Sequence, residues 1–202
     1  MARNSGHRRG TGRTTFSIVV DGETELWYFQ MLRKNESLPT ISVQPELPRK
    51  KKLAEQFDLV YANANSYDHS IWIVDLDVVL MENATDELHG YMDKVRGNEK
   101  IHILINTPCL EFWFLQHFSR TGRFYAQCQH VGNALKRHAV INAYEKSERY
   151  FVRTNPDIYR RLRPYLQTGI ANSEALGQYD RQNPQIAKSE LYQVFQLLGV
   201  TV

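Results

Sequence analysis

The sequence predicts an α/β fold, with a mostly parallel sheet of about four strands, flanking helices, and a helical extension from about residue 108. Over residues 16–105, short and continuously apolar segments alternate with segments of helical periodicity. This alternation is typical of a parallel sheet that is covered on both faces. After residue 106 only helical patterns remain. At 202 residues and 42% hydrophobic, the chain is sufficient for one domain with a sizeable core.

Local patterns define the individual elements. The first, third and fourth predicted strands are short apolar runs, and the first of them ends at an Asp-Gly turn. The four predicted strands are residues 16–20, 41–45, 70–74 and 101–105. The helices between them repeat apolar residues at helical spacing, over residues 24–34, 51–63 and 85–96. Further helices are predicted at residues 108–118, around 131–139, at 157–166 and at 187–198.

Composition also predicts the domain organisation and the compartment. Residues 1–15 are rich in Arg, Gly, Ser and Thr, which predicts a disordered basic arm before a single domain over residues 16–202. Cys109 and Cys128 form no CxxC or metal-type pair, which indicates reduced thiols with neither a zinc site nor a disulfide. No apolar stretch approaches the roughly 20 residues of a membrane span, and no signal-peptide core is present. We therefore expect a cytoplasmic protein that makes no membrane contact.

The net charge of +3 is unevenly distributed along the chain. Residues 1–13 carry +4, residues 14–135 carry −5, and residues 136–163 carry +5. An acidic half beside a basic segment is typical of a metal-dependent enzyme that acts on a polyanion, and it is also found on solvated helices. The basic segment interleaves cations with tyrosines, which suits single-stranded or structured nucleic acid. Its candidate nucleic-acid-binding residues are Arg137, Arg149, Arg153, Arg160 and Arg161, and Lys146 is a candidate for stabilising charge on a scissile phosphate.

Acidic side chains follow three of the four predicted strands. They are Asp21, Glu23 and Glu25 after the first strand, Asp75 and Asp77 after the third, and Glu111 after the fourth. Ligands of open parallel sheets bind at this carboxyl edge, and an extended Asp75–Asp77 segment would place both carboxylates on one face. Such carboxylates repel one another unless a cation such as Mg²⁺ or Mn²⁺ lies between them. Alternatively, these acids only complement helix N-termini or cap turns.

Glu111 fits the capping interpretation poorly. With Thr107 as N-cap and Pro108 at the first helical position, a capping box would need its acid at residue 110, which is a leucine. Helical periodicity instead places Glu111 on an apolar face with Phe114 and Leu115. A charge buried there requires a partner, so we expect a metal or a basic residue beside it.

At these residues the sequence resembles the RloB-like family, a group of bacterial proteins related to the Toprim fold. The matching motifs are Gly-Glu-x-Glu at residues 22–25, Asp75-x-Asp77, and Asn-x-Pro-Cys-x-Glu at residues 106–111 before an aromatic helix. Weaker matches are Tyr-x-Lys at residues 144–146 and Asn-Pro at residues 183–184. Together they extend over most of the chain from residue 16.

The resemblance implies a Toprim-like sheet in which Glu23, Asp75 and Asp77 are catalytic and bind Mg²⁺ or Mn²⁺; we add Glu111 as a metal ligand and Lys146 as a catalytic cation. It also implies a nuclease that hydrolyses phosphodiester bonds in DNA or RNA, in bacterial defence against phage or foreign DNA. Residues 78–80 (Val-Val-Leu) depart from the polar residues that are commoner in relatives, which leaves a second metal ion in doubt.

Other classes of protein remain as alternatives. Phosphatases with a nucleophilic Asp and receiver domains place the reactive acid at the first strand, whereas the Asp-x-Asp here follows the third. Nucleotide-sugar transferases with an Asp-x-Asp site are usually longer. A non-catalytic or partner-gated nucleic-acid-binding module, working beside an ATPase or a restriction partner, is the main alternative. The sequence is also compatible with a homodimer.

Overall fold

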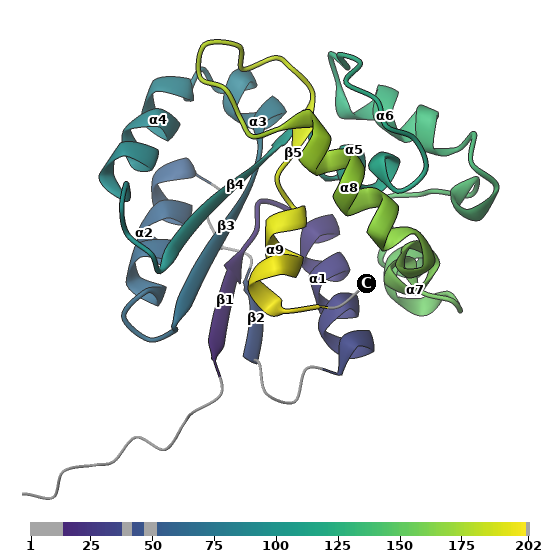
Figure 1. Cartoon of the computed structure of the whole chain (residues 1–202), viewed down its shortest axis with the longest axis horizontal. Helices are drawn as coiled ribbons and strands as arrows, with labels where there is room; N and C mark the ends of the chain where they lie inside the picture. The colour runs from purple at the N-terminus through teal and green to yellow at the C-terminus, as the bar shows by residue number, and fades with distance from the viewer. Residues whose placement is uncertain (1–13, 38–41, 47–51, 201–202) are drawn as a thin grey trace, which may run out of the picture.

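The computed structural model describes residues 14–37, 42–46 and 52–200, and it confirms the α/β prediction. Within these residues, five strands form one sheet in the order β2-β1-β3-β4-β5. β1 (Thr15–Val19), β2 (Ser42–Glu46), β3 (His69–Asp75) and β4 (Ile101–Thr107) are parallel to one another. The short β5 (Lys188–Ser189) pairs antiparallel with β4 (Figure 1).

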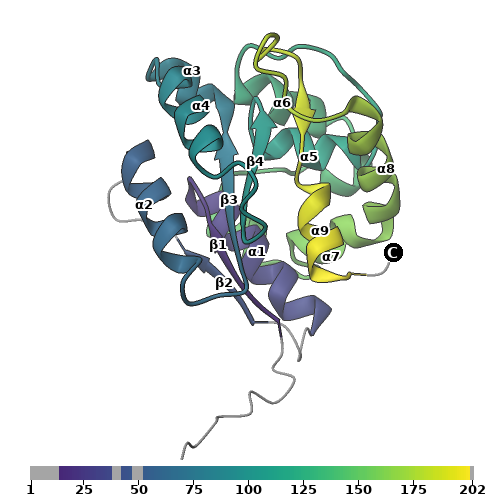
Figure 2. The same cartoon turned by 60° about the vertical axis from the view of Figure 1, so that its left-hand side comes forward.

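Helices cover both faces of this sheet. α1 (Glu23–Glu36) lies on one face, and α2 (Leu53–Asn63), α3 (Leu76–Met81) and α4 (Thr85–Lys94) lie on the other (Figure 2). The helices after β4 gather on the face that α1 covers. They are α5 (Leu110–Gln116), α6 (Cys128–Leu135), α7 (Ile158–Leu162), α8 (Leu166–Leu176) and α9 (Tyr192–Leu198).

Two hydrophobic cores result, one on each face of the sheet. Ile18, Ile71 and Ile73 belong to the larger core, under α1 and the C-terminal helices. Their neighbours Val19 and Trp72 belong to the core under α2 and α4. Because successive strand residues point to opposite faces and both faces are buried, the strands are continuously apolar in sequence.

The order of the strands locates the point where a ligand would bind. From β1 the chain crosses to β2 on one side, and it then returns to place β3 on the other side of β1. In open α/β sheets, the crevice outside the carboxyl ends of two such strands is the usual ligand site. The segments that follow β1 and β3 begin at this position.

Several predicted elements differ in the structure. Residues 75–77 are not extended, because α3 begins at Leu76 and buries Leu76 and Val79 one helical turn apart. The helix predicted at residues 108–118 begins later, because β4 continues to Thr107 and Cys109 is the extended N-cap of α5. The helix predicted at residues 187–198 is shortened at its start by β5.

Residues 136–163 do not form one basic helix. They contain a 3₁₀ turn (Ala139–Ile141), a π-helical turn (Arg149–Arg153) and α7. The basic arm predicted for residues 1–15 falls mostly on residues 1–13, outside the described part of the chain, and Thr15 already belongs to β1. No described helix combines the length and the hydropathy that a bilayer-spanning segment needs.

Candidate functional site

Asp75 stands at the centre of the site, as the last residue of β3. It is 8% exposed, and its side chain does not cap α3. Instead, its Oδ1 accepts a hydrogen bond from Asn106 Nδ2 at 3.2 Å, and its Oδ2 accepts one from the backbone N–H of Leu110 at 3.2 Å. The carboxylate is therefore fixed between the ends of β3 and β4 and the first turn of α5.

Asn106 links three strands at this edge. It lies beside Asp75 in the register of β3 and β4, and it is fully buried. Its Oδ1 accepts a hydrogen bond from Ser189 Oγ of β5 at 2.7 Å, which leaves its amide NH₂ to donate to Asp75. Sequence reasoning assigned Asn106 no role, because Ser189 lies 83 residues away and in a segment predicted as helix.

Glu25, rather than Glu23, joins Asp75. Glu23 is exposed at the first position of α1, whereas Glu25 is 3% exposed and accepts a hydrogen bond from Thr24 Oγ1 at 3.0 Å. A Cβ on Gly22 would lie 2.6 Å from Glu25 Oε2, so the glycine leaves space for this carboxylate. Burial raises the pKa of Glu25 to about 7, and the charge of Glu111 adds to the rise.

The phase of α1 was the signal that could have identified Glu25. With the helix starting at residue 23, Glu25 shares its face with the buried Tyr28, Phe29 and Leu32, three, four and seven positions later. Asp21 is among the acids predicted at this edge, but sequence reasoning assigned it no role in the site. Gln56 Nε2 donates to Asp21 Oδ1 at 2.9 Å, and the charge of Asp21 helps to raise the pKa values of Asp75 and Asp77.

Glu111 has the basic partner that its buried position requires. It is 0% exposed in α5, and Lys146 Nζ lies 2.7 Å from its Oε1. The hydroxyl of Tyr144 donates to the same oxygen at 2.5 Å. Burial alone would lower the pKa of Lys146, but the charges of Glu111, Glu25 and Asp75 raise it. The expectation of a cation beside Glu111 is thus confirmed, and Lys146 reaches the site through this pair.

We call Asp21, Glu25, Asp75, Asp77 and Glu111 the acidic cluster. Burial raises the pKa of Asp75 well above its usual value, and the charges of Glu25, Asp77, Glu111 and Asp21 raise it further. Burial also raises the pKa of Asp77, where Lys146 opposes the rise. Four of the five carboxylates, all except Asp21, interact with the Lys146 ammonium. The cluster supplies hard oxygen donors, which suit Mg²⁺ or Mn²⁺.

A cavity of about 540 Å³ adjoins the acidic cluster. Asp77 lies in its wall. The other lining residues include Thr107 and Pro108, at and just after the end of β4, and Phe124 and Tyr125, from the segment before α6. A backbone hydrogen bond from Asp77 N to Pro108 O, 3.1 Å long, joins the first turn of α3 to the segment between β4 and α5. Another cavity, of about 460 Å³, shares residues 124–126 with this one and is also lined by Arg123 and Arg137.

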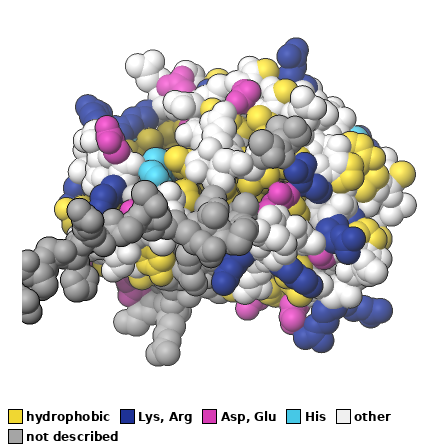
Figure 3. Space-filling model, turned by 60° about the horizontal axis from the view of Figure 1, so that its bottom comes forward, with side chains coloured by type: hydrophobic (Ala, Val, Ile, Leu, Met, Phe, Trp, Pro, Cys, Tyr) yellow, Lys and Arg dark blue, Asp and Glu magenta, His cyan; other side chains and the backbone are white. Residues whose placement is uncertain are grey.

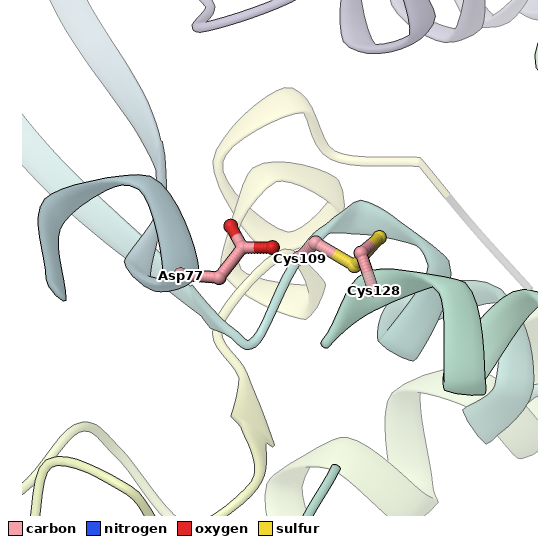
Figure 4. Close-up of side chains that lie close together, drawn as sticks. All are labelled: Asp77, Cys109 and Cys128. Atoms are coloured by element: carbon pink, nitrogen blue, oxygen red, sulfur yellow. A yellow bond between two sulfur atoms is a disulfide. The ribbon is translucent and has the colours of Figure 1, made fainter. Parts of the chain in front are cut away.

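The prediction of two reduced cysteines is wrong, because Cys109 and Cys128 form a disulfide. Cys109 is the N-cap of α5 and Cys128 is the first residue of α6, and these two helices pack together. The 19-residue separation gives no local motif, so sequence reasoning missed the pairing. One carboxylate oxygen of Asp77 and both sulfur atoms lie within 4.8 Å of one another (Figure 4).

The predicted nucleic-acid-binding arginines are divided among different environments. Arg137, Arg149 and Arg160 are exposed. Arg153 pairs with Glu148 at 2.9 Å, and the Arg161 guanidinium lies 4.4 Å from the ring centre of Tyr150. On the face seen in Figure 3, cationic and acidic side chains are interspersed with apolar ones. Arg137 also lines the cavity of about 460 Å³, together with Arg123 and His130.

The fold and the site define a class of protein: a mostly parallel α/β protein with a carboxylate cluster at the switch point of its sheet. Within that class, the chain belongs to the RloB-like protein family, whose family model matches residues 16–198. No curated protein and no solved structure matches the chain.

Proposed function

We propose that this protein is a metal-dependent nuclease that hydrolyses phosphodiester bonds in DNA or RNA. The observation that carries the proposal is the acidic cluster, whose members follow β1, β3 and β4 and meet at one edge of the sheet. Membership of the RloB-like family supports it, since the family resemblance implies a Toprim-like site and a role in bacterial defence. The defence role is part of the proposal.

Asp75, Glu25 and Asp77 are the residues that would hold Mg²⁺ or Mn²⁺. Their donors are carboxylate oxygens, the ligands that hard divalent cations prefer. A bound divalent cation would polarise a phosphoryl oxygen and lower the pKa of a water molecule. Asn106 Nδ2 and Leu110 N orient Asp75 for this task. Glu111 is tied to Lys146 and Tyr144, and we assign it to positioning Lys146.

The cavity beside Asp77 is the place we propose for the substrate strand. It is polar at Asp77 and Thr107 and apolar at Pro108 and Phe124. Phe124 is 54% exposed, so its ring is available to stack on a base. Lys146 is 51% exposed and 2.7 Å from Glu111, so its ammonium is accessible to a phosphate while remaining fixed in position.

The test is cleavage of plasmid DNA, single-stranded DNA and tRNA by the wild-type protein, with Mg²⁺, with Mn²⁺ and with chelator. We expect cleavage of at least one substrate with metal and none with chelator, because the carboxylates need the cation to act on a phosphate. Cleavage that persists in chelator would contradict the proposal. No cleavage under any condition would instead favour a partner-gated enzyme or a nucleic-acid-binding module.

A further inference from the structure

Cys109, Cys128 and Asp77 form a second group of metal-type donors, separate in chemistry from the carboxylates. One ligand atom from each residue lies within 4.8 Å of the other two. Figure 4 shows the Asp77 carboxylate directed toward the cysteines, which come from the N-cap of α5 and the start of α6. In the structure the sulfur atoms are joined to each other and are not available as thiolates.

We propose that reduction of this disulfide creates a site for a thiophilic divalent cation such as Zn²⁺, with Cys109, Cys128 and Asp77 as its ligands. Thiolate sulfur selects Zn²⁺ over Mg²⁺, and a carboxylate oxygen is a common third ligand. Around tetrahedral zinc, sulfur at about 2.3 Å and oxygen at about 2.0–2.2 Å stand roughly 3.5 Å apart. In the structure the three ligand atoms already lie within 4.8 Å of one another, and breaking the disulfide lets the two sulfurs separate toward this spacing.

The redox step is balanced by a dithiol reductant. Its two thiols supply two electrons and two protons to the disulfide, the S–S bond breaks, and the reductant becomes a disulfide itself. The two cysteine thiols lose their protons when the cation binds, since the metal ligand is the thiolate. Three protein ligands leave the fourth position of a tetrahedral ion open, which is typical of reactive rather than structural zinc sites.

The location of this site connects it to the acidic cluster. Asp77 belongs to both donor groups, and Glu111 Oε2 lies 2.7 Å from Cys128 Sγ. If the proposed nuclease is correct, Zn²⁺ at the reduced site removes Asp77 from the carboxylates that hold Mg²⁺. Disulfide formation would then release Zn²⁺ and leave Asp77 free to bind Mg²⁺ with the other carboxylates. This consequence rests on the proposed function, whereas binding of Zn²⁺ does not.

The experiment measures Zn²⁺ and Co²⁺ binding to the full chain, without any nucleic acid. One sample is reduced with a phosphine and freed of it under anaerobic conditions, and a matched sample stays oxidised. We expect one Zn²⁺ per reduced chain and a thiolate-to-metal absorption band with Co²⁺. Oxidation and Cys128→Ser should each weaken binding by about 100-fold, and Asp77→Asn by at least about tenfold.

Circular dichroism of each variant checks that it is folded, and Glu23→Gln is the matched control for the charge change in Asp77→Asn. We expect Glu23→Gln to bind Zn²⁺ as the wild type does, because Glu23 is exposed on α1. Equal binding by reduced wild type and Cys128→Ser, or by the reduced and oxidised samples, would overturn the inference. These readouts involve no hydrolysis, so the inference can fail while the nuclease assignment stands, and the reverse also holds.

Discussion

Asp75→Asn is expected to lower metal-dependent phosphodiester cleavage by at least about 10³-fold, a loss of about 4 kcal/mol of transition-state stabilisation. Asp75 is the carboxylate on which the charges of the other four members of the acidic cluster act. The substitution removes one charged oxygen donor and keeps the side chain's size. The measurement is initial cleavage rate at saturating Mg²⁺, on the substrate that the wild type cleaves best.

Two further variants make this result interpretable. Asp77→Asn changes a half-buried acid that lines the cavity, so it is expected to fold and still to lose most activity. Glu23→Gln makes the same change in charge on the exposed side of α1 and should retain wild-type activity. Retained activity in both aspartate variants, with folding intact, would remove Asp75 and Asp77 from the catalytic site.

Glu25→Gln is expected to stabilise the metal-free protein at high pH. The folded-state pKa of Glu25 is raised to about 7 from 4.5, chiefly by burial, so the folded protein binds this proton more tightly than the unfolded chain does. The stability that the protonated Glu25 contributes is therefore fully present below pH 4.5 and is lost as the pH rises through about 7. The full pKa shift corresponds to a loss of about 3 kcal/mol in the free energy of unfolding. The Glu25→Gln variant avoids this loss, because its side chain carries no charge at any of these pH values.

The measurement is urea unfolding from pH 4 to pH 9 in chelator. We expect equal free energies of unfolding near pH 4 and an advantage for Glu25→Gln that grows to about 3 kcal/mol above pH 7. Mg²⁺ should stabilise the wild type more than the variant at pH 8, because the cation replaces the missing countercharge. A variant that is no more stable than wild type at pH 8 in chelator would show that the Glu25 carboxylate is not buried among like charges.

The fold was largely predictable because both faces of the sheet are buried. Continuous apolar runs located β1, β3 and β4 to within two residues at each end. β5 was not predictable, since a two-residue strand has no periodicity and depends on pairing with β4 across 81 or more residues of chain. α3 was missed because its six residues follow a strand directly and contain β-branched valines, which also favour extended structure.

The sequence predicted that acidic side chains form the site, but it did not predict every residue of the acidic cluster. Position after a strand identified Asp75, Asp77 and Glu111, since strand ends can be read from apolar runs. Choosing between Glu23 and Glu25 needed the helical phase of α1, which depends on where the helix begins. The need for a cation beside Glu111 followed from its apolar face. Lys146 was named as a catalytic cation, but its pairing with Glu111, 35 residues earlier, depended on tertiary packing.

The most direct test of the central claim is a calorimetric titration of the oxidised protein with Mg²⁺ and with Mn²⁺. The set comprises wild type, Asp75→Asn, Glu25→Gln and Glu23→Gln. We predict that wild type and Glu23→Gln bind the cation alike, and that Asp75→Asn and Glu25→Gln lose at least about tenfold in affinity. Loss of binding in Glu23→Gln with retention in Glu25→Gln, or equal binding by all four proteins, would contradict a metal site built on the buried acidic cluster.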